Sequence, residues 1–481
     1  MRGIVETSSM LVLSGTLLAS CSQQGLVVLE CPTGAIDSVV SLDESDELDL
    51  LLVIDDSLRM AEEQASLSAQ LPRLISALAF GDRDGDGTVD FAPPRSIHVG
   101  IVTTDMGTGA SVVMSCPGGN GDDGVLQTGG PYCASSHPTG IFELRQGESV
   151  PGFASMLGCM PIVGTAGCNF EQQLDAALKA VSPAGPTAWT RVGYVPPEFR
   201  DGTFGHAGPG GANDGFLRPN STLAILVLTD EDDCSTTDDD IFNPASTTYS
   251  GELNLRCHDH ATRLQPVERY VDGLTALRAN PGHILFHLIA GVPPDRVGAS
   301  PDVILADPAM VETIDPATGT TLRPACVSPD SRGVAVPARR LVEVARGLQS
   351  RGSYAGISSV CASDFTSAID AFVAEIGDML QPRCLPSPIP LAAPGAVSCQ
   401  LSVVPESGTS CESLGLPAGT MGECALQQVT DPARRGTTPG WFYDDDPTGP
   451  ASRLVPGCDQ RITLSATTLP RNATYHLHCC P

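Results

Sequence analysis

Residues 48–54 have the sequence LDLLLVI, and Asp55, Asp56 and Ser57 follow them directly. An apolar run with so little alternation is typical of a β-strand that is buried on both faces of a sheet. Similar runs occur at 97–103 (IHVGIVT), 223–229 (LAILVLT) and 284–290 (ILFHLIA), with a shorter one at 354–358. We therefore expect a sheet whose strands are largely enclosed.

Helical patterns separate these runs. Residues 60–78 place apolar side chains on one stripe, and Pro72 is expected to kink or split that helix. Further helices are expected at 170–181, 267–277, 337–350 and 365–380. Strands that alternate with helices predict an α/β fold, with a mostly parallel sheet covered by helices on both faces.

The composition changes near residue 384. From there to the end, Pro, Gly, Ser and seven Cys residues crowd together, and no long periodic segment is present. A short segment that cannot build a large core is commonly stabilised by disulfides. We therefore expect residues 385–481 to form a small, disulfide-rich, β-type domain.

The chain is strongly acidic. It has 27 Lys and Arg against 56 Asp and Glu, which gives a formal net charge of −29. A surface of this sign repels the phosphate backbone, so nucleic acid is not expected as a partner.

The N-terminus indicates export. Residues 10–19 form an apolar run too short to span a bilayer, and the following Ser20-Cys21 completes a sequence, LASC, that resembles a bacterial lipobox. The resemblance implies that residues 1–20 are a signal peptide and that Cys21 is lipidated, followed by a flexible tether over 21–45. An ordinary signal peptide is the alternative. We expect a cell-envelope protein, anchored to the outer membrane through lipid alone.

Acidic residues follow two of the expected strands. Asp55 and Ser57 come after the first, and Asp230 comes after the strand at 223–229. In open α/β sheets, ligands bind beyond the carboxyl ends of the strands where the winding direction reverses. If these strands are neighbours, the carboxylates converge and repel each other unless a cation or proton lies between them. Oxygen ligands of this kind suit Mg²⁺ or Mn²⁺.

Four segments in order resemble the von Willebrand factor A (VWA) domain of secreted bacterial lipoproteins. They are VIDDSLRMAEEQ (53–64), HVGIVTTDMGTG (98–109), GCNFEQQLDAAL (167–178) and VLTDEDDCS (227–235). The resemblance covers about residues 46–384 and implies a doubly wound, six-stranded sheet. It also implies a metal-ion-dependent adhesion site at which Asp55, Ser57 and Asp230 hold the cation, and an acidic group of a protein or cell-surface ligand completes its shell.

Two positions depart from the family pattern. Arg59 replaces the second Ser of the DxSxS motif, and Glu171 lies near the position of the family's middle-loop Thr, where it could supply a carboxylate. Arg59 either turns outward toward the acids at 231–233 or replaces the cation. The first case predicts a binding protein. The second predicts a structural or interaction lipoprotein that acts through its Cys-rich domain. No residue pattern indicates an enzyme.

A second metal site is expected at residues 82–90. Asp82, Asp84 and Asp86 occupy alternate positions before Gly87, and Thr88 and Asp90 follow. This is the pattern of the first part of a calcium loop, although Pro93 stands where an EF-hand has its bidentate Glu. The alternative is a solvated acidic turn. A bound Ca²⁺ would be structural.

The Cys count also fits an oxidising compartment. There are 17 Cys residues, and removing Cys21 leaves an even set without any CxxC pair. Spacing alone does not determine the pairing. The pairs that we expect are Cys116–Cys133, Cys159–Cys168, Cys234–Cys257 and Cys31–Cys384.

Overall fold

The computed structural model describes residues 36–40 and 47–480, except 114, 115, 117, 132, 134, 135, 187–192, 220, 279, 331, 332, 382, 383, 386–388, 394, 405–409, 420, 421, 436, 446–459 and 466–473. Within this part of the chain, no helix is both long and apolar enough to cross a membrane.

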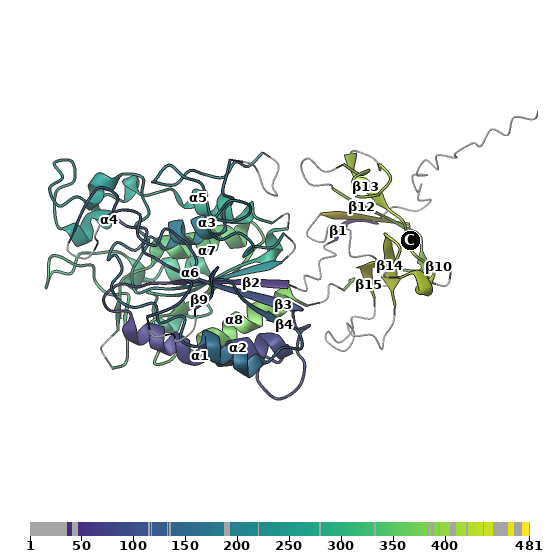
Figure 1. Cartoon of the computed structure of the whole chain (residues 1–481), viewed down its shortest axis with the longest axis horizontal. Coiled ribbons are helices and arrows are strands. Elements are labelled where there is room, and N and C mark those ends of the chain that lie inside the picture. The colour runs from purple at the N-terminus through teal and green to yellow at the C-terminus, as the bar shows by residue number, and fades with distance from the viewer. Residues whose placement is uncertain are drawn as a thin grey trace, which may run out of the picture.

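A six-stranded sheet forms the larger part of the molecule (Figure 1). In spatial order its strands are β4 (Phe142–Arg145), β3 (Ser96–Thr103), β2 (Glu47–Ile54), β5 (Thr222–Leu228), β6 (Ile284–Ala290) and β9 (Tyr354–Ser359). All pairings are parallel except that of β4 with β3. The predicted α/β fold with a mostly parallel sheet is confirmed, and the antiparallel edge strand β4 was not predicted.

Helices cover both faces of this sheet. One face packs against α1 (Ala61–Phe80), α2 (Val150–Leu157) and α8 (Thr366–Met379), and the other against α3 (Gln173–Val181), α5 (Val267–Thr275) and α7 (Arg339–Ser350) (Figure 1). Alternate side chains of β2 enter the two cores, because Leu50 and Leu52 belong to the first and Leu51 and Val53 to the second. Shorter elements lie in the connections: α4 (Arg256–Asp259), α6 (Pro301–Leu305), β7 (Cys326–Val327) and β8 (Val334–Ala335).

Pro72 does not divide α1, which runs unbroken from residue 61 to residue 80. The expectation of a split helix is therefore wrong. A proline inside a helix costs about 3 kcal/mol, whereas each fully buried Leu or Ile contributes about 1.5–3 kcal/mol. Leu67, Leu71, Leu74, Ile75 and Leu78 are all buried on one side of α1, while Pro72 is exposed on the other. The buried stripe outweighs the missing hydrogen bond.

The C-terminal residues build smaller antiparallel sheets. The largest has the order β1 (Ile36–Val40), β16 (Tyr475–Cys479), β12 (Cys399–Val403) and β13 (Cys424–Leu426). Two strand pairs accompany it: β10 (Leu391–Ala393) with β11 (Ala396–Val397), and β14 (Trp441–Asp444) with β15 (Arg461–Leu464). Trp441, Tyr443 and Tyr475 form their core. Residues 36–40, expected in the tether, instead pair with β16 as β1.

The observed disulfides correct two of the expected pairs. Cys116 is joined to Cys168 and Cys133 to Cys159, so Cys116–Cys133 and Cys159–Cys168 are wrong. The loop after β3 folds back so that Cys116 lies beside the segment that precedes α3, which local spacing does not reveal. Cys234 is joined to Cys257 as expected, and Cys326–Cys361, Cys399–Cys479 and Cys411–Cys424 were not predicted. Cys384 is disulfide-bonded, but Cys21 and Cys31 lie outside the described residues.

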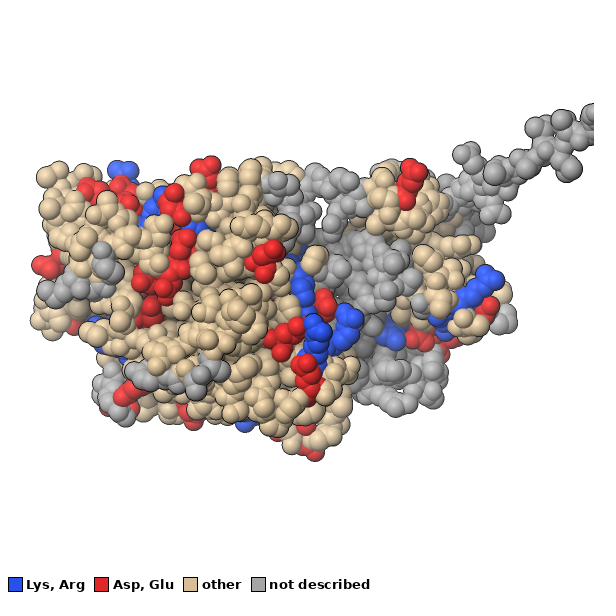
Figure 2. All heavy atoms as spheres, viewed as in Figure 1, with Lys and Arg blue, Asp and Glu red and all other residues tan. Residues whose placement is uncertain are grey.

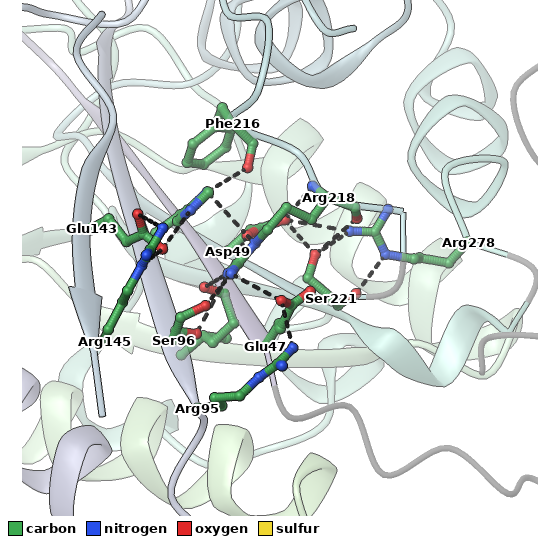
Figure 3. A network of polar contacts seen from close by, with 12 residues as sticks. Glu47, Asp49, Arg95, Ser96, Glu143, Arg145, Phe216, Arg218, Ser221 and Arg278 are labelled. Atoms are coloured by element: carbon green, nitrogen blue, oxygen red, sulfur yellow. Dashed lines mark hydrogen bonds and ion pairs between the residues drawn. The ribbon is translucent and has the colours of Figure 1, made fainter. Parts of the chain in front are cut away.

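A buried ion-pair network closes the amino-terminal end of the sheet (Figure 3). Asp49 of β2 is fully buried, and the Arg218 side chain donates from Nε to its Oδ1 at 2.7 Å, while the Arg218 backbone N–H donates to its Oδ2 at 2.7 Å. The Arg278 guanidinium lies 3.9 Å from the same carboxylate, and burial lowers its pKa to about 10, so it remains charged at neutral pH. Asp49 was not singled out from the sequence, because it lies inside the apolar run.

Replacing Asp49 with Ala should destabilise the protein strongly. Breaking a buried pair from one side leaves an uncompensated charge and costs about 3–5 kcal/mol. We expect a loss of this size in the free energy of unfolding, measured by urea denaturation with circular dichroism. Arg95→Ala is the matched control, because it removes a surface pair with Glu47 (3.0 Å) that is worth about 1 kcal/mol or less. Equal effects of the two variants would contradict a structural role for Asp49.

Candidate metal centre

The candidate site lies where β2 and β5 end side by side. The two strands pair in parallel with Ile54 opposite Leu228, and the Asp55 N–H donates to the Leu228 carbonyl at 2.9 Å. Because their carboxyl ends meet at one edge, Asp55 and Asp230 come together although 175 residues separate them. Their charges act on each other, since Asp55 is the carboxylate that most strongly raises the pKa of Asp230.

Asp55 is held in a fixed orientation. Its Oδ1 accepts from the Ser57 N–H at 2.8 Å, and its Oδ2 accepts from the Thr229 hydroxyl at 2.7 Å. Burial raises the pKa of Asp55, whereas the hydrogen bonds from Thr229 and Ser57 act in the opposite direction. The Gln64 side chain donates to the Asp55 carbonyl at 2.8 Å and so fixes the turn between β2 and α1. This turn presents Ser57, which is also buried, at the same edge.

Asp230 and Glu171 carry oxygens without partners. Asp230 is 8% exposed and Glu171 is 2% exposed, yet Asp230 Oδ1 and Glu171 Oε1 have no hydrogen-bond partner among the described residues. Burial raises the pKa of both carboxyls well above the ordinary value, and neighbouring acids raise it further. The charges of Glu231, Asp55 and Asp230 all raise the pKa of Glu171, which places these acids near one another. The structure thus places Glu171 in the same group as Asp55 and Asp230.

Two disulfides and two amide side chains position the Glu171 segment. Cys116–Cys168 ends just before it, and the Glu171 carbonyl accepts from the N–H of Cys234, which is bonded to Cys257. Gln172 Nε2 donates to the Gly107 carbonyl at 2.8 Å, and Gln173 Nε2 donates to the Thr229 hydroxyl at 2.8 Å. Thr229 therefore connects the Glu171 segment to Asp55.

The acids that follow Asp230 have separate structural roles. Asp232 accepts from the backbone N–H groups of Arg340 and Leu341 at 3.0–3.3 Å and so caps α7. Asp233 accepts from the Leu174 N–H at 3.0 Å near the start of α3, and forms a 3.1 Å ion pair with Arg340. Burial raises the pKa of Asp232 to about 7. These roles were missed because both partners lie far away in the sequence.

Arg59 lies at the mouth of the site rather than inside it. Its side chain is exposed, and it forms no ion pair within 4.0 Å with a carboxylate in the part of the chain that the structure describes. Its charge nevertheless lowers the pKa of Asp230 and Glu231, which places it near them. Arg59, Glu171 and Asp230 line one cleft of about 510 Å³, together with Glu312 and Arg340.

The donor set fits a hard divalent cation. Carboxylate and hydroxyl oxygens are the ligands that Mg²⁺ and Mn²⁺ prefer, and unpartnered buried oxygens at Asp230 and Glu171 are costly without a cation or a proton. Mg²⁺ keeps several waters and takes only one or two carboxylates directly. The carboxylate oxygens of this site do not all lie within 4.8 Å of one another; among the described residues, only Asp82, Asp84 and Asp86 form a group of three that does.

The loop at 82–90 has these three carboxylates on one side. The Asp82 carboxylate accepts from the N–H groups of Gly85 (2.7 Å) and Gly87 (2.9 Å), both of which have positive φ. Asp90 Oδ2 accepts from the Arg83 N–H at 2.8 Å, and Arg83 forms a 2.6 Å ion pair with Asp378 of α8. The loop is therefore fastened to α8, and Asp82, Asp84 and Asp86 remain together at its surface.

Another buried acid, Asp56, was not predicted. Its pKa is raised to about 8 by burial and then by the charges of Asp105, Asp55 and Asp122. In the sequence it is only the variable residue after Asp55, and nothing there indicates that Asp105 and Asp122 lie beside it.

The chain has only weak similarity to known proteins. No protein-family model and no curated protein matches the sequence. Two structures of the pilus adhesin SpaC from Lactobacillus rhamnosus GG, one of them in the open conformation, align with 9% and 8% sequence identity and TM-scores of 0.22 and 0.21. The alignments cover 90% of this chain and 38% and 39% of the adhesin chains. These adhesins are therefore weak structural neighbours, and at such values the likeness supports no argument about this chain.

Proposed function

We propose that this protein is a secreted, lipid-anchored binding protein with a VWA-like, doubly wound domain. In this proposal the domain captures an acidic group of a protein or cell-surface ligand through a divalent cation. The supporting observation is the pair of buried, unpartnered carboxylate oxygens on Asp230 and Glu171, beside Asp55 and open to one cleft.

Each residue has a defined part in this proposal. Asp55, Ser57 and Asp230 hold Mg²⁺ or Mn²⁺, and Glu171 adds a carboxylate from the facing loop. Thr229 and Gln173 keep Asp55 and the Glu171 segment in register through their hydrogen bonds. The cation, when bound, supplies the positive charge that attracts the ligand's acidic group.

The competing function is a structural lipoprotein in which Arg59 replaces the cation. A guanidinium in that position would form ion pairs with Asp55 or Asp230, as Arg218 does with Asp49 at the opposite end of the sheet. The exposed position of Arg59, without such a pair among the described residues, favours the cation.

Mn²⁺ should stabilise the wild-type protein, and Asp230→Ala should abolish much of this effect. A ligand that binds only the folded state adds about 2.7 kcal/mol at a concentration 100 times its Kd. The melting temperature would be followed against Mn²⁺ in a background in which Asp82→Asn and Asp84→Asn disable the 82–90 loop. Asp214→Ala, which removes an exposed acid, is the control and should leave the shift unchanged.

Two outcomes of this experiment would contradict the proposal. The first is a Mn²⁺ shift that Asp230→Ala leaves intact. The second is a wild-type protein whose melting temperature does not change with Mn²⁺, together with an Arg59→Ser variant whose melting temperature rises. That result would support the competing function.

We further propose that Asp82, Asp84 and Asp86 bind Ca²⁺, with the Thr88 carbonyl and Asp90 as further ligands. The ion would fasten the segment between α1 and β3. Asp84→Asn should abolish the heat of Ca²⁺ binding at this loop in isothermal titration and leave the metal-free melting temperature nearly unchanged, because Asp84 is exposed. Asp378→Asn, outside the carboxylate group, is the control. Equal Ca²⁺ binding by wild type and Asp84→Asn would refute the site.

The proposed location is the cell envelope, through a lipid on Cys21. Cys21→Ser should move the protein from the membrane fraction to the soluble fraction, because one residue carries the anchor. Fractionation of the expressing bacterium would measure this, with Ser20→Ala as the control that keeps the thiol. A Cys21→Ser protein that stays with membranes would exclude lipidation as the cause of attachment.

A further inference from the structure

The only lysine in the sequence, Lys179, is buried near the end of α3. On the face viewed in Figure 2, the visible basic side chains lie mostly beside acidic ones at the surface, whereas the Lys179 side chain is completely buried. Arginine is the usual residue for a buried ion pair, because its guanidinium stays charged and donates several hydrogen bonds. A buried lysine can also lose its proton and act as a nucleophile, which an arginine does not do.

The Lys179 amine lies between two carboxylates. Its Nζ is 2.6 Å from Asp123 Oδ1 and 2.8 Å from Asp201 Oδ2. These two Asp side chains are only 21% and 12% exposed, and Nζ lies 5.4 Å from the centre of the Phe199 ring. The cavity that these residues line has a volume of about 10 Å³, so it holds at most one water molecule. An amine and two carboxyl groups therefore meet where water is largely excluded.

Asp123 is held against α3 in an unusual backbone conformation. In the part of the chain that the structure describes, it is the only residue other than glycine with a positive φ (57°). L-residues rarely adopt this conformation, and it persists only where the surrounding structure imposes it. Gly124 permits the close approach, because a Cβ at this position would lie 2.9 Å from the Ala176 carbonyl oxygen of α3. The Asp123 carboxylate thus reaches Lys179.

The two carboxyl groups differ in their other partners. The His206 Nε2 lies 2.8 Å from the Asp123 carbonyl oxygen and 3.2 Å from Asp123 Oδ2. Because a carbonyl oxygen can only accept, Nε2 carries a hydrogen and directs it at this carboxyl group. Asp201 accepts from the Thr203 N–H at 3.0 Å and from its hydroxyl at 2.8 Å. Burial opposes ionisation, but hydrogen bonds from Lys179 and Thr203 lower the pKa of Asp201 below its ordinary value, so Asp201 is available as a base.

We propose that Lys179 and Asp123 join in an intramolecular isopeptide bond. Nζ first gives one proton to Asp123 Oδ1, and the neutral amine then attacks the Asp123 Cγ. The His206 N–H stabilises the negative charge that develops on Oδ2. Asp201 takes a second proton from Nζ and passes it to the leaving Oδ1 hydroxyl. The C–O bond breaks, one water is released, and no oxidant or cofactor is consumed.

Two features of the site favour this reaction. Groups that the fold holds in contact react as though they were present at very high concentration, and the exclusion of water opposes hydrolysis of the product. The amide would fasten the loop after β3 to α3 covalently. It would form whether or not the proposed metal sites bind cations.

The mass of the reduced and denatured protein tests this assignment. Wild type should be lighter than its composition requires by one water molecule. Lys179→Arg should have its full mass, because a guanidinium does not attack the carboxyl group. Asp201→Asn should also have its full mass, because the base is missing although both reacting residues remain. Circular dichroism would verify that the variants fold, and Asp214→Asn, at an exposed position, should retain the loss of water.

A protease that cleaves after lysine provides an independent measurement, because Lys179 is its only site in the sequence. It should leave denatured, reduced wild type uncut and cleave Asp201→Asn once. Digestion with other proteases should release a branched peptide that contains both Lys179 and Asp123, identified by tandem mass spectrometry. This peptide distinguishes the isopeptide from a cyclic imide at Asp123–Gly124, which also loses one water but leaves the lysine free.

Two outcomes would overturn the proposal. The first is a wild-type protein of full mass that is cleaved after Lys179, which would show that Lys179 and Asp123 form only an ion pair. The second is a loss of water that persists in Lys179→Arg, which would assign that loss to the cyclic imide. The measurement on wild type decides between bond and ion pair even if Lys179→Arg does not fold.

Discussion

The rest of the structure depends on how the sheet compensates the carboxylates that it buries. A charge removed from water must be paired, bound to a cation or neutralised by a proton. At the amino-terminal end of β2, Asp49 meets two guanidinium groups and two hydroxyl or amide donors, so the chain compensates this charge itself. At the carboxyl end, Asp55 receives only neutral donors. Because of this difference between the two ends of β2, the carboxyl end is a candidate for binding a cation.

Maintaining such an uncompensated group requires rigid surroundings. Mutual repulsion would drive the acids apart unless covalent and hydrogen-bonded links held their segments. Cys116–Cys168 and Cys234–Cys257 staple the segments on either side of Glu171, and Phe170 packs against Phe242 with ring centroids 4.9 Å apart. Asp232 and Asp233 fasten the same turn to α7 and α3. Asp232 and Asp233, which have partners, therefore hold in place the turn that carries the unpartnered Asp230.

The fold could be predicted because strands buried on both faces leave continuous apolar runs, such as residues 48–54, and helices leave stripes. The meeting of Asp55 and Asp230 followed from one topological rule about strand ends. Features that rest on distant partners could not be predicted. Short strands such as β1 and β4 have no periodic signal, and β1 pairs with a strand more than 400 residues away. Disulfide pairing and the neighbours of Asp56 depend on the path of a glycine-rich loop, which periodicity does not describe.

The effect of Arg59 on the site depends on whether its guanidinium lies inside the site or at its mouth. Inside the site, a guanidinium would compete with a divalent cation; at the mouth, it adds positive charge without occupying a ligand position. Asp55, Glu171, Asp230 and Glu231 together outweigh one divalent cation, so a site with the cation alone would still repel an acidic ligand unless protons remained on some of them. An exposed Arg59 offsets part of this excess and attracts acids from a distance, because charge acts well beyond contact. Although Arg59 departs from the DxSxS pattern, it is thus compatible with the proposed ligand capture when it stays outside the coordination shell.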